Sequence, residues 1–406
     1  MKLRLPLSIV AFVLALSLIG CSNSATTSTT APTTPKFLLA LDGYGAGNNV
    51  NVFPVNATTG VLGAPVTGSA FDLGLTRAMT AAVHPNGHFV YAADGNDGSI
   101  HAWDVSETTG IPVEIAPKVI NHSASYFFSG NYGNVITVTP SGKFLYSANN
   151  DATVGAYTIG TDGSLTHLAD LNVGACATGM ITANDSFVWV TDTCYNLLPG
   201  IVRPVGNRTV RNGTADNTQA AKCETTGCGN GAGNVVSLSI GADGTLTRVG
   251  SLSLTNVYAQ LVSIQVNPMA KFLYVGENGG QLYSLSVATD GSLTQLAVQA
   301  PLSGTPADLA HSPDGKFLYA TSLADHAGAF SVDTTSGAVT ELAASPYTGG
   351  IGQIIVDVTG QFVYLGDPIG SGQVIGYTRD LTTGALTPIG NTATAGNRAI
   401  AVGIIR

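Results

Sequence analysis

Charged side chains are scarce in this chain of 406 residues, where Asp, Glu, Lys and Arg together make up 10%. Soluble domains usually carry about 25%, so Gly, Thr, Ser and Asn must supply much of the polar surface. Acidic residues outnumber basic ones by 25 to 16, which gives a net charge of −9, or −11 once Lys2 and Arg4 are removed with a leader segment. This balance disfavours nucleic acids and anionic membrane surfaces as partners.

Cysteine is also rare, and the five cysteines include no Cys-x-x-Cys pair with a nearby histidine. This absence disfavours a zinc site. When Cys21 is set aside, Cys176, Cys194, Cys223 and Cys228 form an even set, which suits disulfides in an oxidising compartment. Cys176 and Cys194 flank an expected hairpin, so we predict one bridge between them and a second between Cys223 and Cys228.

Three catalytic signatures are missing: the phosphate-binding loop, the Gly-x-Ser-x-Gly elbow and the His-Glu-x-x-His helix. No helical period of apolar residues stands out either. The sequence thus gives no support to the enzyme classes that these motifs mark.

The N-terminus has the layout of a secretory signal. Residues 1–20 hold two basic residues and an apolar run that is short for a membrane span. A Leu-Ile-Gly-Cys sequence ending at Cys21 resembles the bacterial lipobox, so we predict a lipidated Cys21 and a Ser/Thr/Pro-rich tether over residues 21–35. The protein is then exported and lipid-anchored to a bacterial membrane, in the periplasm or at the cell surface. An ordinary signal peptide with an incidental cysteine is the alternative.

One pattern fills residues 36–406: a tight turn, often Pro-x-Gly, followed by a strand that opens on Phe-x-Tyr. The successive Phe residues are 52, 55, 43, 85, 45 and 45 positions apart, which is the range of β-propeller blades. The spacing of 85 marks one blade with an insertion at residues 195–233. The seven strands begin at Phe37, Phe89, Phe144, Phe187, Phe272, Phe317 and Phe362.

A second mark in each repeat is a glycine turn between its two outer strands, where Gly supplies the positive φ that short hairpins need. Short Val-, Ile-, Leu-, Tyr- and Thr-rich segments lie between the marks. They predict an all-β fold: a seven-bladed β-propeller of four-stranded antiparallel blades. The first repeat has no strand before residue 36, so residues 397–405 should close the ring by pairing with residues 36–41. The turn glycines are Gly60, Gly110, Gly163, Gly244, Gly291, Gly337 and Gly384.

The repeated Pro-x-Gly-Lys-Phe-Leu-Tyr-x-x-Asn sequence and the Asp-Gly-Ser-Leu-Thr hairpins resemble those of the seven-bladed propeller lactonase family. This is the 6-phosphogluconolactonase-type group, which is also similar to proteins with Tyr-Val-Thr-Asn repeats. The resemblance covers residues 36–406. It implies a carboxylic ester hydrolase that opens lactones, although the repeated residues are structural and fold alone does not set activity.

Polar residues recur five positions after each Phe, at the end of the second strand, and would ring one mouth of the channel. One interpretation is that they end their strands in Asx turns. The other is a ligand-binding ring for a cation or a hydroxylated ligand. Ca²⁺ suits such oxygen ligands, but carboxylates spread around a wide ring do not all reach one ion, and we expect no cofactor. The positions are Asp42, Asp94, Asn149, Asp192, Glu277, Ser322 and Asp367.

Lactone opening needs a base for water and a cation for the oxyanion. The resemblance implies Arg, His and Glu near the channel. Glu277 is the candidate base, Arg77 and Arg398, which precede two inner strands, are the candidate cations, and His122 is a second candidate base. Each arginine could instead be an ordinary surface residue.

Two functions remain open. The first is a lactone hydrolase that acts outside the cytoplasm, where the phosphorylated sugar lactone of cytosolic metabolism is not expected. The second is a non-catalytic propeller that binds a glycan, a peptide or a partner protein. Metal-dependent hydrolysis by the propeller is a third hypothesis. We expect a monomer that contacts the membrane only through its N-terminal lipid.

Overall fold

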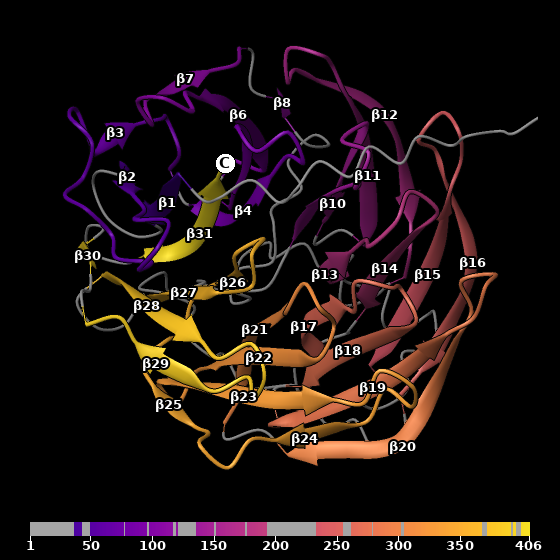
Figure 1. Ribbon diagram of the computed structural model, residues 1–406. Helices are drawn as coiled ribbons and strands as arrows, with labels where there is room; N and C mark the ends of the chain where they lie inside the picture. The colour runs from indigo at the N-terminus through magenta and orange to yellow at the C-terminus, as the bar shows by residue number, and fades with distance from the viewer. Residues whose placement is uncertain are drawn as a thin grey trace, which may run out of the picture. The chain divides into compact units, whose positions relative to one another are not determined.

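Seven antiparallel sheets follow one another around an axis in the computed structural model, which forms a β-propeller within residues 33–406 (Figure 1). None of the described residues belongs to a helix that could cross a membrane. The predicted fold class is confirmed. Residues 1–35, Cys21 among them, and most of the insertion lie outside the described residues. The structure describes residues 36–42, 49–76, 78–95, 97–116, 119–120, 135–149, 152–174, 177–192, 233–254, 261–277, 279–301, 304–367, 372–390, 393–394 and 399–406.

The first strand of each blade lies nearest the axis and contacts the first strands of the two neighbouring blades. These strands are short and rich in Ala, Val, Ile and Thr, which fit the narrow space there. In blade order they are β31 (Ala399–Ile405), β4 (Ala78–Val83), β9 (Ile136–Val138), β13 (Ala177–Ile181), β17 (Leu261–Val266), β21 (Pro306–His311) and β26 (Ile354–Val356).

The second strands each begin at the predicted Phe, and nearly all of their side chains are buried. They are β1 (Phe37–Asp42), β5 (Phe89–Asp94), β10 (Phe144–Ala148), β14 (Phe187–Asp192), β18 (Phe272–Glu277), β22 (Phe317–Ser322) and β27 (Phe362–Asp367). β1 pairs antiparallel with β31, from Phe37 opposite Ile405 to Asp42 opposite Ala399. The predicted closure of the ring by the C-terminal strand is thereby confirmed.

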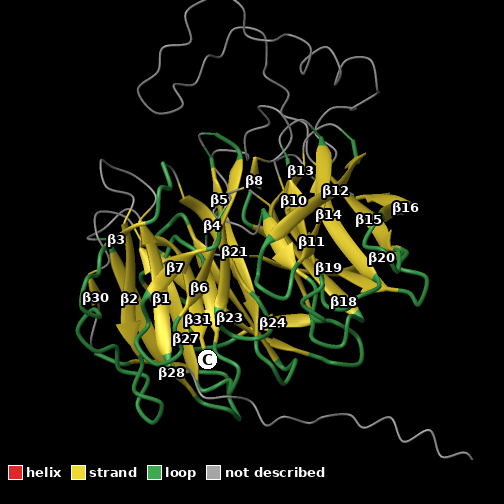
Figure 2. Cartoon of the chain, turned by 90° about the horizontal axis from the view of Figure 1, so that it is seen from above, coloured by secondary structure: helices red, strands yellow, loops and turns green. Residues whose placement is uncertain are grey.

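The third strands lie farther from the axis: β2 (Asn49–Pro54), β6 (Ser99–Val105), β11 (Thr153–Ile159), β15 (Asn234–Ile240), β19 (Gln281–Val287), β23 (His326–Val332) and β28 (Gln373–Arg379). Outer strands are continuous in blades three to five, as β12 (Leu165–Asn172), β16 (Leu246–Ser253) and β20 (Leu293–Pro301). In blades two, six and seven two short pieces pair with one third strand: β7 (Pro112–Glu114) with β8 (Val119–Ile120), β24 (Val339–Glu341) with β25 (Tyr347–Thr348), and β29 (Leu386–Pro388) with β30 (Ala393–Thr394). Blade one ends in β3 (Phe71–Asp72). Figure 2 shows the blades in a view at right angles to that of Figure 1, with loops at the strand ends.

The hydrophobic core is divided into seven clusters, one at each interface between neighbouring blades. The cluster between blades seven and one, for example, joins Phe362 and Tyr364 of β27 to Leu38 and Phe53 of blade one. Each sheet is therefore apolar on both faces because each face is covered by another blade.

The Phe and the turn glycine of the repeat contact each other across these interfaces. All seven turn glycines have positive φ, as predicted. A Cβ atom on any of them would lie within 2.9 Å of a Phe ring of the preceding blade, so a larger residue does not fit. The seven pairs are Phe37 with Gly110, Phe89 with Gly163, Phe144 with Gly244, Phe187 with Gly291, Phe272 with Gly337, Phe317 with Gly384 and Phe362 with Gly60.

The Tyr of the repeat stabilises the same interface, because its hydroxyl donates a hydrogen bond to the carbonyl oxygen of the turn glycine. Tyr146 Oη donates to the carbonyl oxygen of Gly244 at 2.9 Å, and Tyr319 Oη donates to that of Gly384 at 2.8 Å. Where Trp189 replaces the tyrosine, Ser237 Oγ donates to Gly291 O at 2.6 Å instead. The repeated Phe, Tyr and Gly residues thus join neighbouring blades, and we call this set of contacts the inter-blade lock.

Candidate active site

The second strands all end at the same side of the propeller, and we call the seven polar residues at their ends the rim positions. Six of them are buried, and Asp367 is half-buried. Five of them pair with the first strand of the same blade, as Asp94 does with Ala78, whereas the first-strand pairing ends before Asn149 and Asp367. The rim positions are Asp42, Asp94, Asn149, Asp192, Glu277, Ser322 and Asp367.

Two rim side chains bind the loops of their own blade. Both carboxylate oxygens of Asp94 accept hydrogen bonds from Thr76 Oγ1, at 2.9 and 2.8 Å, and Oδ2 also accepts the Thr76 backbone N–H. Asn149 Nδ2 donates to Thr153 Oγ1 at 3.0 Å. These contacts fix the loop before the first strand in blade two and the loop before the third strand in blade three.

Glycine lets the backbone approach two other rim residues. A Cβ at Gly174 would lie 1.9 Å from Asp192 Oδ2, and one at Gly304 would lie 2.5 Å from Ser322 Oγ. Both glycines belong to loops that enter a first strand, so these loops pass directly over the rim side chains. At these positions the rim residues support the loops that surround the mouth.

Glu277 has a different partner. It is 3% exposed, and its Oε2 accepts a hydrogen bond of 2.8 Å from Tyr283 Oη, on the third strand of the same blade. Burial, with the hydrogen bond and negative charge of Glu277, raises the pKa of Tyr283 above its ordinary value. The phenol therefore stays protonated and donates to a carboxylate whose position is fixed.

β-Bulges occur in the first strands of blades one, two, four, five and six, next to the residue that pairs with the rim residue. Bulges redirect side chains and are frequent beside functional sites. Arg77 and Arg398, together with His122, lie outside the described residues. However, Ala78 pairs with Asp94 and Ala399 pairs with Asp42, in neighbouring blades, whereas Glu277 belongs to blade five. The fold thus separates Glu277 by three blades from the residues that follow the two arginines.

The channel is bridged by Gln353, directly before β26. Its Nε2 donates to Ala81 O at 3.1 Å, and its Oε1 accepts from the backbone N–H groups of Ala81 and Val402, both at 3.4 Å. One buried side chain of blade seven therefore joins the first strands of blades one and two. The repeat pattern did not predict this contact. Gln353 lies nine residues before Phe362, the first residue of the second strand in blade seven.

Asp308 stands at the equivalent position, nine residues before Phe317, and is 1% exposed. Its Oδ2 accepts the Ile354 N–H at 3.0 Å, while Oδ1 has no hydrogen-bond partner within the part of the chain that the structure describes. Burial raises the pKa of Asp308 to about 7, against the opposing effect of backbone N–H groups. Sequence reasoning passed over this residue, but an Asp in the middle of a mostly apolar first strand is a signal that could have found it.

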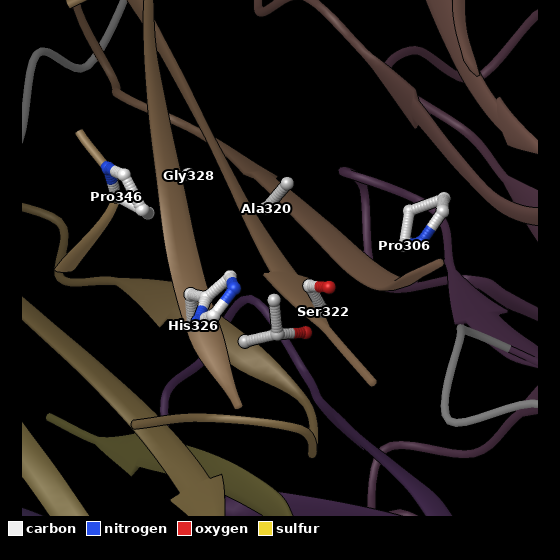
Figure 3. A pocket seen from close by; sticks show the side chains of 7 residues that line it. Pro306, Ala320, Ser322, His326, Gly328 and Pro346 are labelled. Carbon is white, nitrogen blue, oxygen red and sulfur yellow. The ribbon is translucent and has the colours of Figure 1, made fainter. Parts of the chain in front are cut away.

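Blade six contains a small cavity beside Ser322 and His326 (Figure 3). Its volume is about 10 Å³, which is room for about one water molecule. Among the described residues, no group of three or more His, Cys, Asp or Glu side chains could hold a metal ion.

Comparison with known proteins agrees with the fold. Residues 301–402 match the family model of the lactonase seven-bladed β-propeller, and residues 76–104 match that of the WD domain G-β repeat. The chain has the fold of the seven-bladed propeller lactonases. No curated protein matches it in sequence.

Solved structures extend the likeness over most of the chain. A candidate 6-phosphogluconolactonase from Bacteroides fragilis has a TM-score of 0.68 at 18% identity, covering 93% of this chain and 100% of that one. A similar candidate from Bacteroides uniformis has a TM-score of 0.68 at 16% identity, covering 91% and 99%. The periplasmic gluconolactonase of Pseudomonas aeruginosa has a TM-score of 0.65 at 14% identity, covering 91% and 99%.

Proposed function

We propose that this protein hydrolyses a lactone at the mouth that the rim positions surround, and that it does so outside the cytoplasm. The observation that carries the proposal is Glu277, a buried carboxylate at the rim that is fixed by the phenol of Tyr283. The lactonase match of residues 301–402 and the gluconolactonase among the similar structures support the reaction class. The predicted signal and lipidated Cys21 support the location.

In this reaction Glu277 takes a proton from water, and the oxygen of that water attacks the lactone carbonyl carbon. The tetrahedral oxyanion collapses, the ring C–O bond breaks, and the leaving alkoxide takes up a proton to give a hydroxy acid. Arg77 and Arg398 stabilise the oxyanion. Because Glu277 is three blades away from the residues that follow them, the lactone would have to lie across the mouth, with its carbonyl oxygen toward the arginines.

The substrate class follows from charge and location. A net charge of −9 does not favour a phosphorylated lactone as substrate. An exported enzyme also does not encounter the phosphorylated sugar lactone of the cytosol. We therefore expect an unphosphorylated lactone.

A lactone panel followed by pH-stat tests this function on the full-length protein. Proton release is expected with at least one unphosphorylated lactone, at the same rate with and without EDTA. Release that EDTA abolishes would point to metal-dependent hydrolysis, and a panel without any release would contradict the proposal.

The second candidate is a non-catalytic propeller whose rim binds a glycan, a peptide or a partner protein. It is favoured by Asp94, whose carboxylate is buried and bound to its own loop. Under this alternative, no lactone is opened and the loops around the mouth form the binding surface.

A further inference from the structure

A second cavity lies at the opposite end of the channel from the rim. Its volume is about 180 Å³, and it is partly open to solvent. The first strands of blades seven, one and two line it with apolar side chains, including Val83, Ile355 and Val402. For comparison, an apolar cavity of about 150 Å³ holds benzene, so this one has room for a six-membered ring.

Gln353 lines this cavity and ties together the first strands around it. The hydrogen bonds from its side chain to Ala81 and Val402 cross the space between the three first strands. Breaking them would leave buried amide groups unpaired, which is costly. The described lining of the cavity comes from blades seven, one and two, whereas Glu277 belongs to blade five.

Arg406 is the one basic residue among the described residues that line the cavity. Its backbone N–H donates to Gly87 O at 3.0 Å, which fixes the start of the side chain. Its Nε is buried, without a hydrogen-bond partner among the described residues, so a ligand in the cavity would contact the terminal Nη groups of the guanidinium. A half-buried guanidinium of this kind is stabilised by an anion that accepts two parallel hydrogen bonds.

Asp357 is the one acidic residue among the described residues that line the cavity. Its Oδ1 accepts the Phe362 N–H at 2.8 Å and its Oδ2 accepts the Thr359 N–H at 3.1 Å and the Thr359 hydroxyl. These bonds hold the turn between the first two strands of blade seven. Both carboxylate oxygens of Asp357 are therefore held by this turn.

We propose that this cavity binds a small organic carboxylate with an apolar body of about six carbon atoms. The apolar part fills the space between Val83, Ile355 and Val402, and the carboxylate pairs with the guanidinium of Arg406. The ligand is recognised by shape and one negative charge, and this site is independent of the chemistry proposed at the rim.

Isothermal titration calorimetry with benzoate, and with uncharged benzamide of the same shape, tests the proposal on the full-length protein. Benzoate should bind with measurable affinity, and benzamide at least about tenfold more weakly, because the charged hydrogen bonds are lost. Arg406→Gln should weaken benzoate binding at least about tenfold. Ala81→Leu, which fills the cavity, should abolish it.

Two controls separate the site from general effects. Lys316→Gln removes one exposed positive charge at the same end of the blades but not in the cavity, and should leave benzoate binding unchanged. Glu277→Gln, at the rim, should also leave it unchanged. The proposal is overturned if benzoate does not bind, if benzamide binds equally well, or if Arg406→Gln binds benzoate as well as the unaltered protein does. The Arg406 comparison stands even if Ala81→Leu fails to fold.

Discussion

Tyr364 Oη donates a hydrogen bond of 2.7 Å to the carbonyl oxygen of Gly60, a residue 304 positions earlier in the chain. The ring of Phe362 packs on the same glycine. This contact joins blade seven to blade one and repeats the lock that holds most other neighbouring blades. Closure of the ring therefore uses the ordinary contact of the repeat as well as the pairing of β31 with β1.

Gly60→Ala should destabilise the propeller more than Gly390→Ala. Both glycines have positive φ, so each alanine costs about 1–2 kcal/mol of backbone strain. Only at Gly60 would the new Cβ lie 2.4 Å from a Phe362 ring atom, whereas Gly390 has open space around it. The clash should add about 1–3 kcal/mol. Urea denaturation of the two variants measures the difference, and equal midpoints would contradict the lock.

Deletion of residues 399–406 should unfold the protein or lower its melting temperature sharply. β31 supplies the first strand of blade one, and its removal exposes the backbone of β1 from Phe37 to Asp42 as an unpaired edge. The lost burial and hydrogen bonds are large relative to a typical stability of about 5–15 kcal/mol. Circular dichroism melting gives the result, and an unchanged melting temperature would show that closure does not depend on this strand.

Asp308→Asn should stabilise the protein at neutral pH and above. The folded carboxyl has its pKa raised to about 7, while that of the unfolded chain is near 3.8. Stability is therefore full below about pH 4, falls as the unfolded state ionises first, and stays low above pH 7. The variant should remove this fall, with a gain of about 1–4 kcal/mol. Denaturant titrations from pH 4 to 8 would show it.

Asp333→Asn is the matched control for that experiment. Backbone N–H groups of Ser336 and Thr335 lower the pKa of Asp333 in an exposed turn. Its ionised form is thus favoured in the folded state, so the substitution should not raise stability at neutral pH. A gain of the same size as in Asp308→Asn would show that general charge, and not burial, causes the effect.

Cys176 and Cys194 should form one disulfide, and Cys223 and Cys228 another. All four cysteines lie outside the described residues. Ala177, which follows Cys176 in the sequence, pairs with Asp192, two positions before Cys194, so each of these cysteines is within two positions of the end of this strand pair. Peptide mapping of the unreduced protein identifies the linkages. Free thiols or a Cys194–Cys223 bridge would refute this pairing.

The fold was predictable because its signals recur within every repeat. The Phe positions set the second strands, the glycine turns set the hairpins, and the missing first strand before residue 36 led directly to the C-terminal strand. The contact between the Phe residues and the turn glycines was not predictable. The Phe of one repeat packs on the glycine of the next repeat, and the spacing of the repeats does not show this.

The candidate site was predictable only in part. Counting from each Phe located the rim positions, and most of them are buried at strand ends. The partner of Glu277 could not be foreseen, because Tyr283 reaches it through the pairing of two strands. Repeat order already assigned the arginines to blades two and one and Glu277 to blade five, but counting repeats does not give the distance between them across the mouth.

The most direct test of this account compares lactone hydrolysis by Glu277→Gln and Glu341→Gln. Both substitutions remove a carboxylate, but Glu341 is exposed on an outer strand. On a lactone that the unaltered protein opens, Glu277→Gln should lower kcat at least about a hundredfold, since it removes the base for water. Glu341→Gln should leave kcat unchanged, and both variants should melt as the unaltered protein does. Full activity in a folded Glu277→Gln variant would contradict the proposed role of this residue.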